Sequence, residues 1–191
     1  MLAASSFVLA LMASVATALP PVPGPIVLST EEAAVVTMGN VMVRYGGDAR
    51  QTVAVVDIAA TPDTVMAAVM DLPARVRDID ALTAVDIYST SGAQVKAKWT
   101  MSFAMIDVNF HIAYDCAMSA GWCVYTLDDS RENDPESSNG SYQAYVHGEG
   151  TRLVYRTDSL AAGAPEWVRK KLAGSAAKEM LGGMKARAEK P

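Results

Sequence analysis

The sequence predicts an α+β fold, the helix-grip arrangement, in which a curved antiparallel sheet wraps around a long C-terminal helix. Two short helices follow the first strand that grips this helix, at residues 52–59. Three observations predict it. A strand-like segment, two short helical segments and another strand follow one another between Val53 and Ser89. Strand-like segments with one apolar face then succeed one another up to Ser159, and one long amphipathic segment ends the chain. One-sided strands and a one-sided helix bury their apolar faces against each other.

The first helix has a well-marked start. Residues 52–59 form a strand-like segment, and Thr61 then supplies a side chain that can cap a helix. Pro62 suits the first helical turn, and Asp63 favours the positive end of the helix dipole. Pro73 ends this helix, and a second short helix is predicted over residues 74–79.

The middle of the chain alternates between apolar and polar residues. Val95, Ala97 and Trp99 alternate with Lys96 and Lys98, which predicts a strand with one covered face and one wet face. Strands are predicted at residues 33–45, 84–89, 94–104, 108–116, 123–128, 141–147 and 151–159. Residues 130–140 are polar and rich in turn formers, so a loop is predicted there.

The last segment predicts a long helix that begins at Ala164-Pro165-Glu166. Its apolar residues recur every fourth position: Val168, Leu172, Ala176, Met180 and Met184. Gly182 and Gly183 should each weaken this helix by about 1 kcal/mol relative to alanine.

Composition indicates one globular domain without a nucleic-acid partner. The 191 residues are 51% hydrophobic and 19% charged, which is enough apolar material for a sizeable core. The net charge is -5, and no basic stripe with interleaved aromatic residues is present. Nucleic-acid binding is therefore disfavoured. The residues do not define an oligomeric state.

The N-terminus has the features of an export signal. Residues 1–18 are an apolar run that ends in Ala16-Thr17-Ala18, although no Lys or Arg precedes it. We expect a signal peptide (1–18) cut after Ala18, a Pro-rich linker (19–32) and one domain (33–191), in a periplasmic or secreted protein. The alternative is that the run forms a buried N-terminal helix.

Cys116 and Cys123 flank a predicted turn between two strands. Symmetric placement about such a turn puts two cysteines opposite each other, within reach of a disulfide bond. A cross-strand disulfide is favoured over two free buried thiols, since an exported protein meets an oxidising compartment. No histidine lies close enough in the sequence to complete a zinc site, so no metal is expected.

Three segments together resemble the helix-grip superfamily, which includes START-like lipid carriers and the polyketide cyclases and dehydratases (SRPBCC proteins). They read VDIAATPDTVMAAVMDLPARVRDI, NGSYQAYVHGEGTRLVYRTD and APEWVRKKLAGSAAKEMLGGMKARAE. Tyr142 stands where the family usually has tryptophan. The resemblance spans residues 52–189 and implies a cavity between the sheet and the terminal helix. It indicates the fold more strongly than a function, because this fold hosts carriers, receptors and enzymes.

An apolar lining is the main candidate binding site. By alternation and by the resemblance, the following residues should face the interior: Trp99, Met101, Phe103, Phe110, Ile112, Tyr114, Tyr142, Leu153, Tyr155, Val168, Leu172, Met180 and Met184. Such a lining predicts binding and transport of a lipid, a sterol or a similar apolar small molecule, without a cofactor. The simpler alternative is that these side chains fill the core, and the domain is then a protein-interaction module.

A second hypothesis is a cyclase or dehydratase that acts on a polyketide-like substrate in the same cavity. Its nearest catalytic candidates are Asp107, Asn109, His111 and Tyr114. Periodicity favours an outward position for His111, because alternation places Val108, Phe110 and Ile112 on the inner face. His147 lies beside a glycine turn and is expected at an exposed loop end.

Charged residues elsewhere are interpreted as solvated surface. These are Arg75, Arg77, residues 169–171 and the acidic residues between 128 and 136. A transient membrane contact is also possible in this interpretation, through Arg169-Lys170-Lys171 and anionic lipid headgroups.

Overall fold

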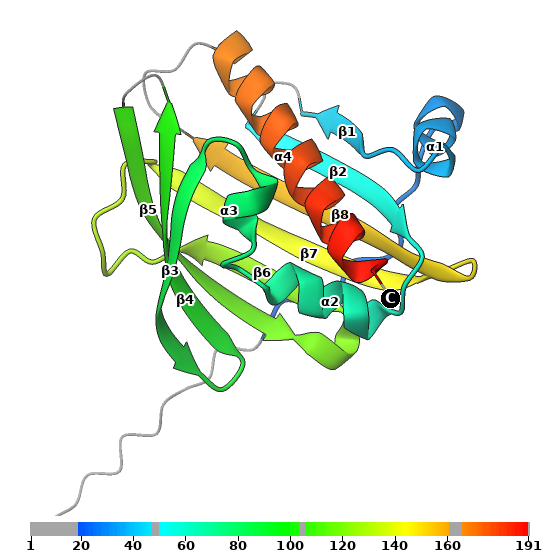
Figure 1. Cartoon of the computed structure of the whole chain (residues 1–191), viewed down its shortest axis with the longest axis horizontal. Coiled ribbons are helices and arrows are strands. Elements are labelled where there is room, and N and C mark those ends of the chain that lie inside the picture. The colour runs from blue at the N-terminus through cyan, green and yellow to red at the C-terminus, as the bar shows by residue number, and fades with distance from the viewer. Residues whose placement is uncertain (1–18, 47–49, 104–105, 161–165, 191) are drawn as a thin grey trace, which may run out of the picture.

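The computed structural model describes residues 19–46, 50–103, 106–160 and 166–190, and their side chains except at 103, 106 and 166–173. Within these residues, eight strands form one antiparallel sheet in the order β1-β2-β8-β7-β6-β5-β4-β3 (Figure 1). The strands are β1 (Met42–Tyr45), β2 (Gln51–Ile58), β3 (Leu82–Ser91), β4 (Gln94–Phe103), β5 (Ile106–Ala117), β6 (Trp122–Leu127), β7 (Ser137–His147) and β8 (Gly150–Leu160). The helices are α1 (Thr30–Thr37), α2 (Pro62–Met70), α3 (Arg75–Asp78) and α4 (Glu166–Ala188), with a short 3-10 turn at Met118–Ala120.

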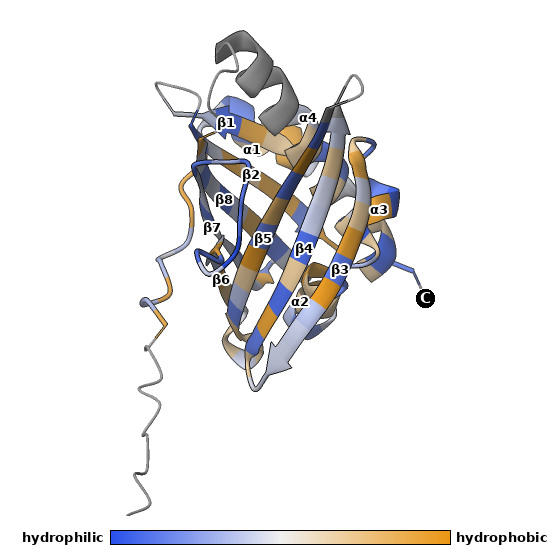
Figure 2. Ribbon diagram, turned by 90° about the vertical axis from the view of Figure 1, so that its left-hand side faces the viewer, coloured by the Kyte–Doolittle hydropathy of each residue, from blue (hydrophilic) through white to orange (hydrophobic). Residues whose placement is uncertain are grey.

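The predicted architecture is confirmed. The sheet curves around α4, which crosses its inner face, while α2 and α3 lie beside that helix (Figure 1). Figure 2 shows the outer side of the sheet, where polar and apolar residues alternate along β3, β4 and β5. In the described part of the chain, no helix is both long and apolar enough to cross a bilayer.

Two hydrophobic clusters cover opposite faces of the sheet. The larger cluster lies on the inner face and joins the sheet to α2 and α4, with Val69, Ile112, Leu153, Leu181 and Met184 among its buried members. The smaller cluster lies on the outer face, where α1 packs over β1, β2 and β8 through Val36, Met42, Val55 and Val154. Burial of apolar area in both layers drives the sheet to hold this shape.

The segment before α1 lies along the outer face. The carbonyl of Pro20 accepts a hydrogen bond from Trp122 Nε1 at 3.1 Å, and that of Pro23 accepts one from Gln143 Nε2 at 2.6 Å. The amide of Ile26 donates to the Tyr145 hydroxyl at 3.3 Å. Most of the stretch predicted as a linker is therefore docked on the sheet, and its last three residues begin α1.

One predicted strand is wrong in its first half. Residues 33–45 were expected to be one strand, but residues 30–37 form α1 and only Met42–Tyr45 is extended. Ser29 and Glu32 form a capping box, in which each side chain bonds the other residue's amide. This local cap outweighs the strand preference of Val35 and Val36. By contrast, Thr61 caps α2 as expected, and its hydroxyl accepts from the Thr64 amide.

Gly183 is required where α3 approaches α4. A Cβ built at Gly183 would lie 2.7 Å from Asp78 Cβ and closer still to the carboxyl group, whereas a Cβ at Gly182 would meet nothing. The carboxylate of Asp78 is in turn bound by Arg187 of α4. The paired glycines thus have different roles: Gly183 makes room for an ion pair that joins the two helices, and Gly182 faces open space.

The cross-strand disulfide is confirmed. Cys116 and Cys123 are register partners on β5 and β6, and their sulfurs are bonded, with a Cα–Cα distance of 4.0 Å. Both side chains are buried on the inner face, and Met70 Sδ lies 3.4 Å from Cys116 Sγ.

The two glycines give a matched test of helix packing. Gly182→Ala should raise the free energy of unfolding by about 1 kcal/mol, because it lowers the backbone entropy of the unfolded chain without a clash. Gly183→Ala should lower it by about 1–3 kcal/mol, because Asp78 must move away from Arg187. Urea unfolding of both variants measures the difference, and equal stabilisation of both would contradict the close approach at Gly183.

The disulfide should stabilise the fold modestly. It closes a short loop with a sequence separation of 7, for which loop entropy predicts about 2–3 kcal/mol. The double variant Cys116→Ala/Cys123→Ala should therefore lose about that much in guanidinium unfolding. Wild-type protein treated with a reductant serves as the control, and an unchanged midpoint in both samples would refute the prediction.

Candidate functional site

The inner face of the sheet beneath α4 brings together most of the predicted lining residues. Trp99, Ile112, Tyr114, Tyr142, Leu153, Met180 and Met184 are buried in the inner cluster. Met101, Phe110 and Tyr155 pack against it but remain partly exposed. The side chains of Phe103, Val168 and Leu172 lie outside the described residues. The structure thus confirms the inward position of the described residues, while ligand binding stays a prediction.

Four tyrosines form the centre of this face. Tyr125 lies next to Tyr114, Tyr142 and Tyr155, with ring centroids 5.8, 5.9 and 6.3 Å away. The hydroxyls of Tyr125 and Tyr155 are 2.8 Å apart, and the Tyr142 hydroxyl donates to Met180 Sδ at 3.3 Å. Burial raises the pKa of Tyr114, Tyr125, Tyr142 and Tyr155, so all four are neutral at pH 7. The centre of the inner face is therefore aromatic and uncharged, with hydroxyl groups for orientation.

Tyr125 was missing from the predicted lining, although alternation along its strand indicates it. Cys123 faces inward, so Tyr125 two residues later must share that face. A Cβ at Gly140 of β7 would lie 2.5 Å from the Tyr125 hydroxyl. Glycine at this position leaves room for the tyrosine ring.

Partly exposed apolar side chains border the inner face at both ends of β5. At one end, Cys116 packs with Cys123 and Met70, and both Met70 and Val95 of β4 remain partly exposed. Toward the other end, Phe110 stacks on Trp99 with centroids 6.0 Å apart, and Phe110 is partly exposed. Solvent therefore reaches apolar inner-face side chains at the end of the sheet near the start of β5 and the end of β4.

Arg75 was predicted to be solvated surface, and this is wrong. Its side chain is fully buried, with 0% of its surface exposed. Arg75 Nη2 donates to the carbonyl of Val69 at 2.6 Å, and the guanidinium lies 5.7 Å from the centroid of the Tyr142 ring. The sequence did contain a signal, because Leu72, Arg75 and Ile79 have the spacing of one buried helix face.

Several buried polar atoms on the inner side lack hydrogen-bond partners. They are Nε and Nη1 of Arg75, Nε1 of Trp99 and Oγ1 of Thr52. Buried polar groups are normally paired, and each unpaired one costs free energy. Unpaired donors on an apolar inner face are the arrangement expected of a site whose ligand supplies the acceptors.

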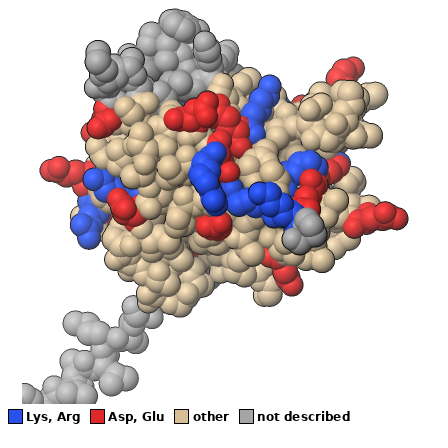
Figure 3. Space-filling model, in the orientation of Figure 1, with Lys and Arg blue, Asp and Glu red and all other residues tan. Residues whose placement is uncertain are grey.

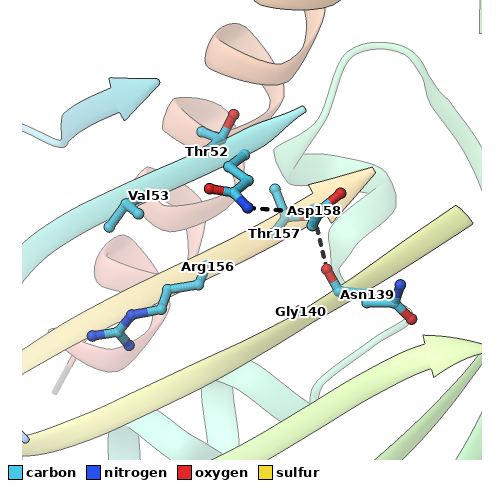
Figure 4. A pocket seen from close by; sticks show the side chains of 8 residues that line it. Thr52, Val53, Asn139, Gly140, Arg156, Thr157 and Asp158 are labelled. Atoms are coloured by element: carbon cyan, nitrogen blue, oxygen red, sulfur yellow. Dashed lines mark hydrogen bonds between the residues drawn. The ribbon is translucent and has the colours of Figure 1, made fainter. Parts of the chain in front are cut away.

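Two surface hollows are less suited to binding. One is a groove of about 310 Å³ over β2, β8 and β7, lined by residues that include Val53, Asn139, Arg156 and Asp158 (Figure 4). Asp158 is already paired there with Arg50 and Gln51. The second, of about 470 Å³, lies between α3 and α4, where charged side chains gather in Figure 3.

The two acidic groups of that second hollow are also paired. Asp78 binds Arg187, and Glu179 accepts a hydrogen bond from the Asp80 amide at 3.1 Å. Arg187 Nε is buried there without a hydrogen-bond partner, 3.8 Å from Asp71 Oδ2, so this hollow also holds one unpaired donor.

The polar trio of the enzyme hypothesis points away from the interior. Asp107 is exposed, Asn109 accepts a hydrogen bond from Thr100, and His111 Nδ1 lies 3.0 Å from the carbonyl of Glu132. Tyr114 is the one candidate of the four that lies on the inner face. His147 is half exposed, 3.9 Å from Asp57 at a strand end. Outward positions were expected for both histidines.

The acidic residues between 128 and 136 were predicted to be solvated surface, and this is wrong for Asp128. Asp128 is buried and accepts hydrogen bonds from Ser130 Oγ at 2.6 Å, Tyr88 at 2.7 Å and Lys96 at 3.0 Å. The bonds from Ser130, with those from Tyr88 and Lys96, hold the pKa of Asp128 well below its usual range. Burial and this contact raise the pKa of Tyr88 to about 12.

The segment that follows Asp128 is pinned to β5 in the same way. The amides of Asn109 and His111 donate to the side chains of Asp134 and Asn133, both at 2.6 Å. Residues 128–134 therefore form an anchored loop on the outer face. In addition, β7 begins at Ser137 inside the region predicted as a loop, because Ser137–Gly140 pair with β8.

Solved structures share this architecture. The protein TTHA0849 from Thermus thermophilus is 18% identical over 72% of this chain and 96% of its own, with a TM-score of 0.62. A STAR-related lipid transfer protein fragment from Xanthomonas axonopodis is 14% identical over 78% of this chain and 93% of its own, with a TM-score of 0.60. The chain has a START-like helix-grip fold.

A third solved structure with this fold is named as an enzyme and not as a lipid transfer protein. The Zhui aromatase/cyclase from a Streptomyces species is 17% identical over 77% of this chain and 87% of its own, with a TM-score of 0.52. No protein-family model and no curated protein sequence matches the chain. Since these identities are low, the likeness establishes the START-like fold, and the function must be inferred from the residues of the inner face.

The Asp128 network gives a pH-dependent prediction. Asp128→Asn should lower the free energy of unfolding at pH 7 by about 1–3 kcal/mol, since it removes charged acceptors from three donors. Because the folded-state pKa lies below the unfolded one, this stabilisation is present above about pH 4 and is lost as the pH falls below that value.

Urea unfolding of wild type and variant between pH 7 and pH 3 should therefore show two converging curves. Asp129→Asn is the matched control, because Asp129 is the exposed neighbour. A stability difference that stayed constant down to pH 3 would show that Asp128 is not held by these bonds.

Proposed function

We propose that this protein binds one apolar small molecule, such as a lipid or sterol, between the inner face of its sheet and α4. The molecule is carried or protected rather than chemically changed. The observation that carries the proposal is the partial exposure of Met101, Phe110 and Tyr155, which are large apolar side chains packed against the buried inner cluster. A ligand that covers these side chains removes their apolar surface from water together with its own.

Burial of apolar surface on this face can supply the free energy needed to bind a small molecule. At about 25 cal/mol per Å², burial of about 400 Å² of apolar surface contributes about 10 kcal/mol before the cost of association. The residues that would make the contact include two methionines of α4, Met180 and Met184, whose unbranched side chains adapt to different ligand shapes. The solved START-like structure named as a lipid transfer protein is consistent with such a ligand.

A carrier is favoured over a cyclase by the chemistry of the inner face. Of the buried polar residues that the structure describes, Thr52, Arg75 and Thr151 lie on the inner side, and none of them is a general base at neutral pH. Asp107, Asn109 and His111 lie on the outer side. The fold of the aromatase/cyclase is shared, but of the four residues proposed for that chemistry only Tyr114 lies on the inner face.

Export belongs to the same proposal. Cleavage after Ala18 would place the protein in the periplasm or outside the cell, where the Cys116–Cys123 disulfide is stable. Contact of residues 169–171 with anionic headgroups would assist loading, although their side chains lie outside the described residues.

Native mass spectrometry of protein purified from its own cell envelope tests the proposal. We expect a complex heavier than the chain by one small molecule, which organic extraction removes, because an apolar ligand would be retained through purification. The same spectrum tests export, since a chain cut after Ala18 begins at Leu19. A bare chain mass, together with failure of the purified protein to bind the neutral dye Nile red, would sink the proposal.

Variants locate the binding surface. Phe110→Arg should weaken Nile red binding at least tenfold, because a guanidinium at this position would be buried by any ligand on the inner face. Val146→Arg is the matched control and should bind as wild type, since Val146 is 71% exposed on β7. Fluorescence titration measures both, with circular dichroism to confirm folding, and equal binding by the two variants would exclude the inner face.

A further inference from the structure

Arg75 is a fully buried cation without an anionic partner. It forms no ion pair among the described residues, and its one hydrogen bond goes to the carbonyl of Val69 at 2.6 Å. The nearest acid on its own helix is Asp78, whose carboxylate is already bound by Arg187. A guanidinium stays charged in proteins, so this interior holds an uncompensated positive charge.

Such a charge is expensive to maintain. Burial lowers the pKa of Arg75, which reflects the cost of removing the cation from water. The face of the Tyr142 ring at 5.7 Å and the Val69 carbonyl compensate only part of that cost. An apolar side chain of similar length would cover the same space without the penalty. A purely structural role therefore leaves the guanidinium unexplained.

The free donors of Arg75 are numerous. Nε and Nη1 carry three N–H groups between them, and both nitrogens are buried without partners. Trp99 Nε1 is a further unpaired donor on the inner side. The Tyr142 hydroxyl donates only to a thioether sulfur, which is a weak acceptor. The interior thus offers unpaired N–H donors beside the ring of Tyr142.

We propose that the ligand is an amphipathic anion, with an apolar body and a single carboxylate, and that Arg75 binds the carboxylate. This inference rests on the function proposed above and names the ligand class. A planar guanidinium matches a carboxylate through two parallel hydrogen bonds, and the pair neutralises the buried charge. The apolar body would then extend over the tyrosine cluster toward Phe110 and Met101, where the inner face is partly exposed.

The test compares two probes that differ only in the head group. Dodecanoate and dodecanol are titrated against wild-type protein loaded with Nile red, below their solubility limits at pH 7.5, and displacement gives the two dissociation constants. We expect dodecanoate to bind at least tenfold more tightly than dodecanol. In Arg75→Met this ratio should fall to about one, and Arg75→Lys should recover part of it.

Arg77→Met is the matched control, since it removes the same charge from an exposed position on the same helix. It should keep the wild-type ratio, which excludes a general effect of net charge.

The outcomes separate this inference from the proposed function. If wild type binds both probes equally, or if neither displaces bound Nile red, the anion site is wrong and apolar binding stands. If wild type does not bind Nile red at all, the proposed function fails as well. If Arg75→Met lowers the unfolding temperature of the empty protein and leaves the ratio unchanged, Arg75 only holds the Val69 carbonyl, and the inference is overturned.

Discussion

The structure depends on the covering of the inner face of the sheet by α4. Alternation along each long strand places apolar side chains on that face, and they would be exposed without the helix. The helix is held at its C-terminal half by the ion pair between Arg187 and Asp78, and Gly183 lets α3 approach closely enough to form it. Because α3 also carries Arg75, the contact between α3 and α4 also sets the position of this cation, the one that is buried among the residues the structure describes.

The outer face of the sheet is covered by other segments of the chain. Over β2 and β8 it is covered by α1 and by the segment that contains Pro20 and Pro23, which bond to Trp122 and Gln143. Over β4 and β5 it is covered by the loop anchored through Asp128. The polar residues that first suggested catalysis, His111 and Asn109, belong to this outer layer and bond to the anchored loop. Their hydrogen bonds hold that loop against β5 on the outer face.

Most of the fold could be predicted from the sequence, because the spacing of apolar residues agreed with the residues that start and end helices and turns. Alternation around Trp99 gave the strands, and Thr61-Pro62 gave the start of α2. The errors arose where a local signal competed with composition. The valines after Ser29 predicted a strand, but the Ser29–Glu32 capping box starts a helix there. The serines at the start of β7 were predicted to be a loop, although β8 pairs with them. Arg75 was assigned to the surface because its charge was weighed above its spacing from Leu72 and Ile79. Asp128 could not be placed, since its partners come from β3 and β4, forty and thirty-two positions away.

The two edge strands bear on how the protein behaves at high concentration. β1 has four residues, and Arg44 on it is tied to Glu32 of α1. β3 is long, but its register with β4 shifts twice, between Leu82 and Ala84 and between Ile87 and Ser89. A short strand and an irregular one are poor templates for pairing with another chain. An open sheet of this size is thereby protected against edge-to-edge aggregation, even though Ile87 is exposed on β3.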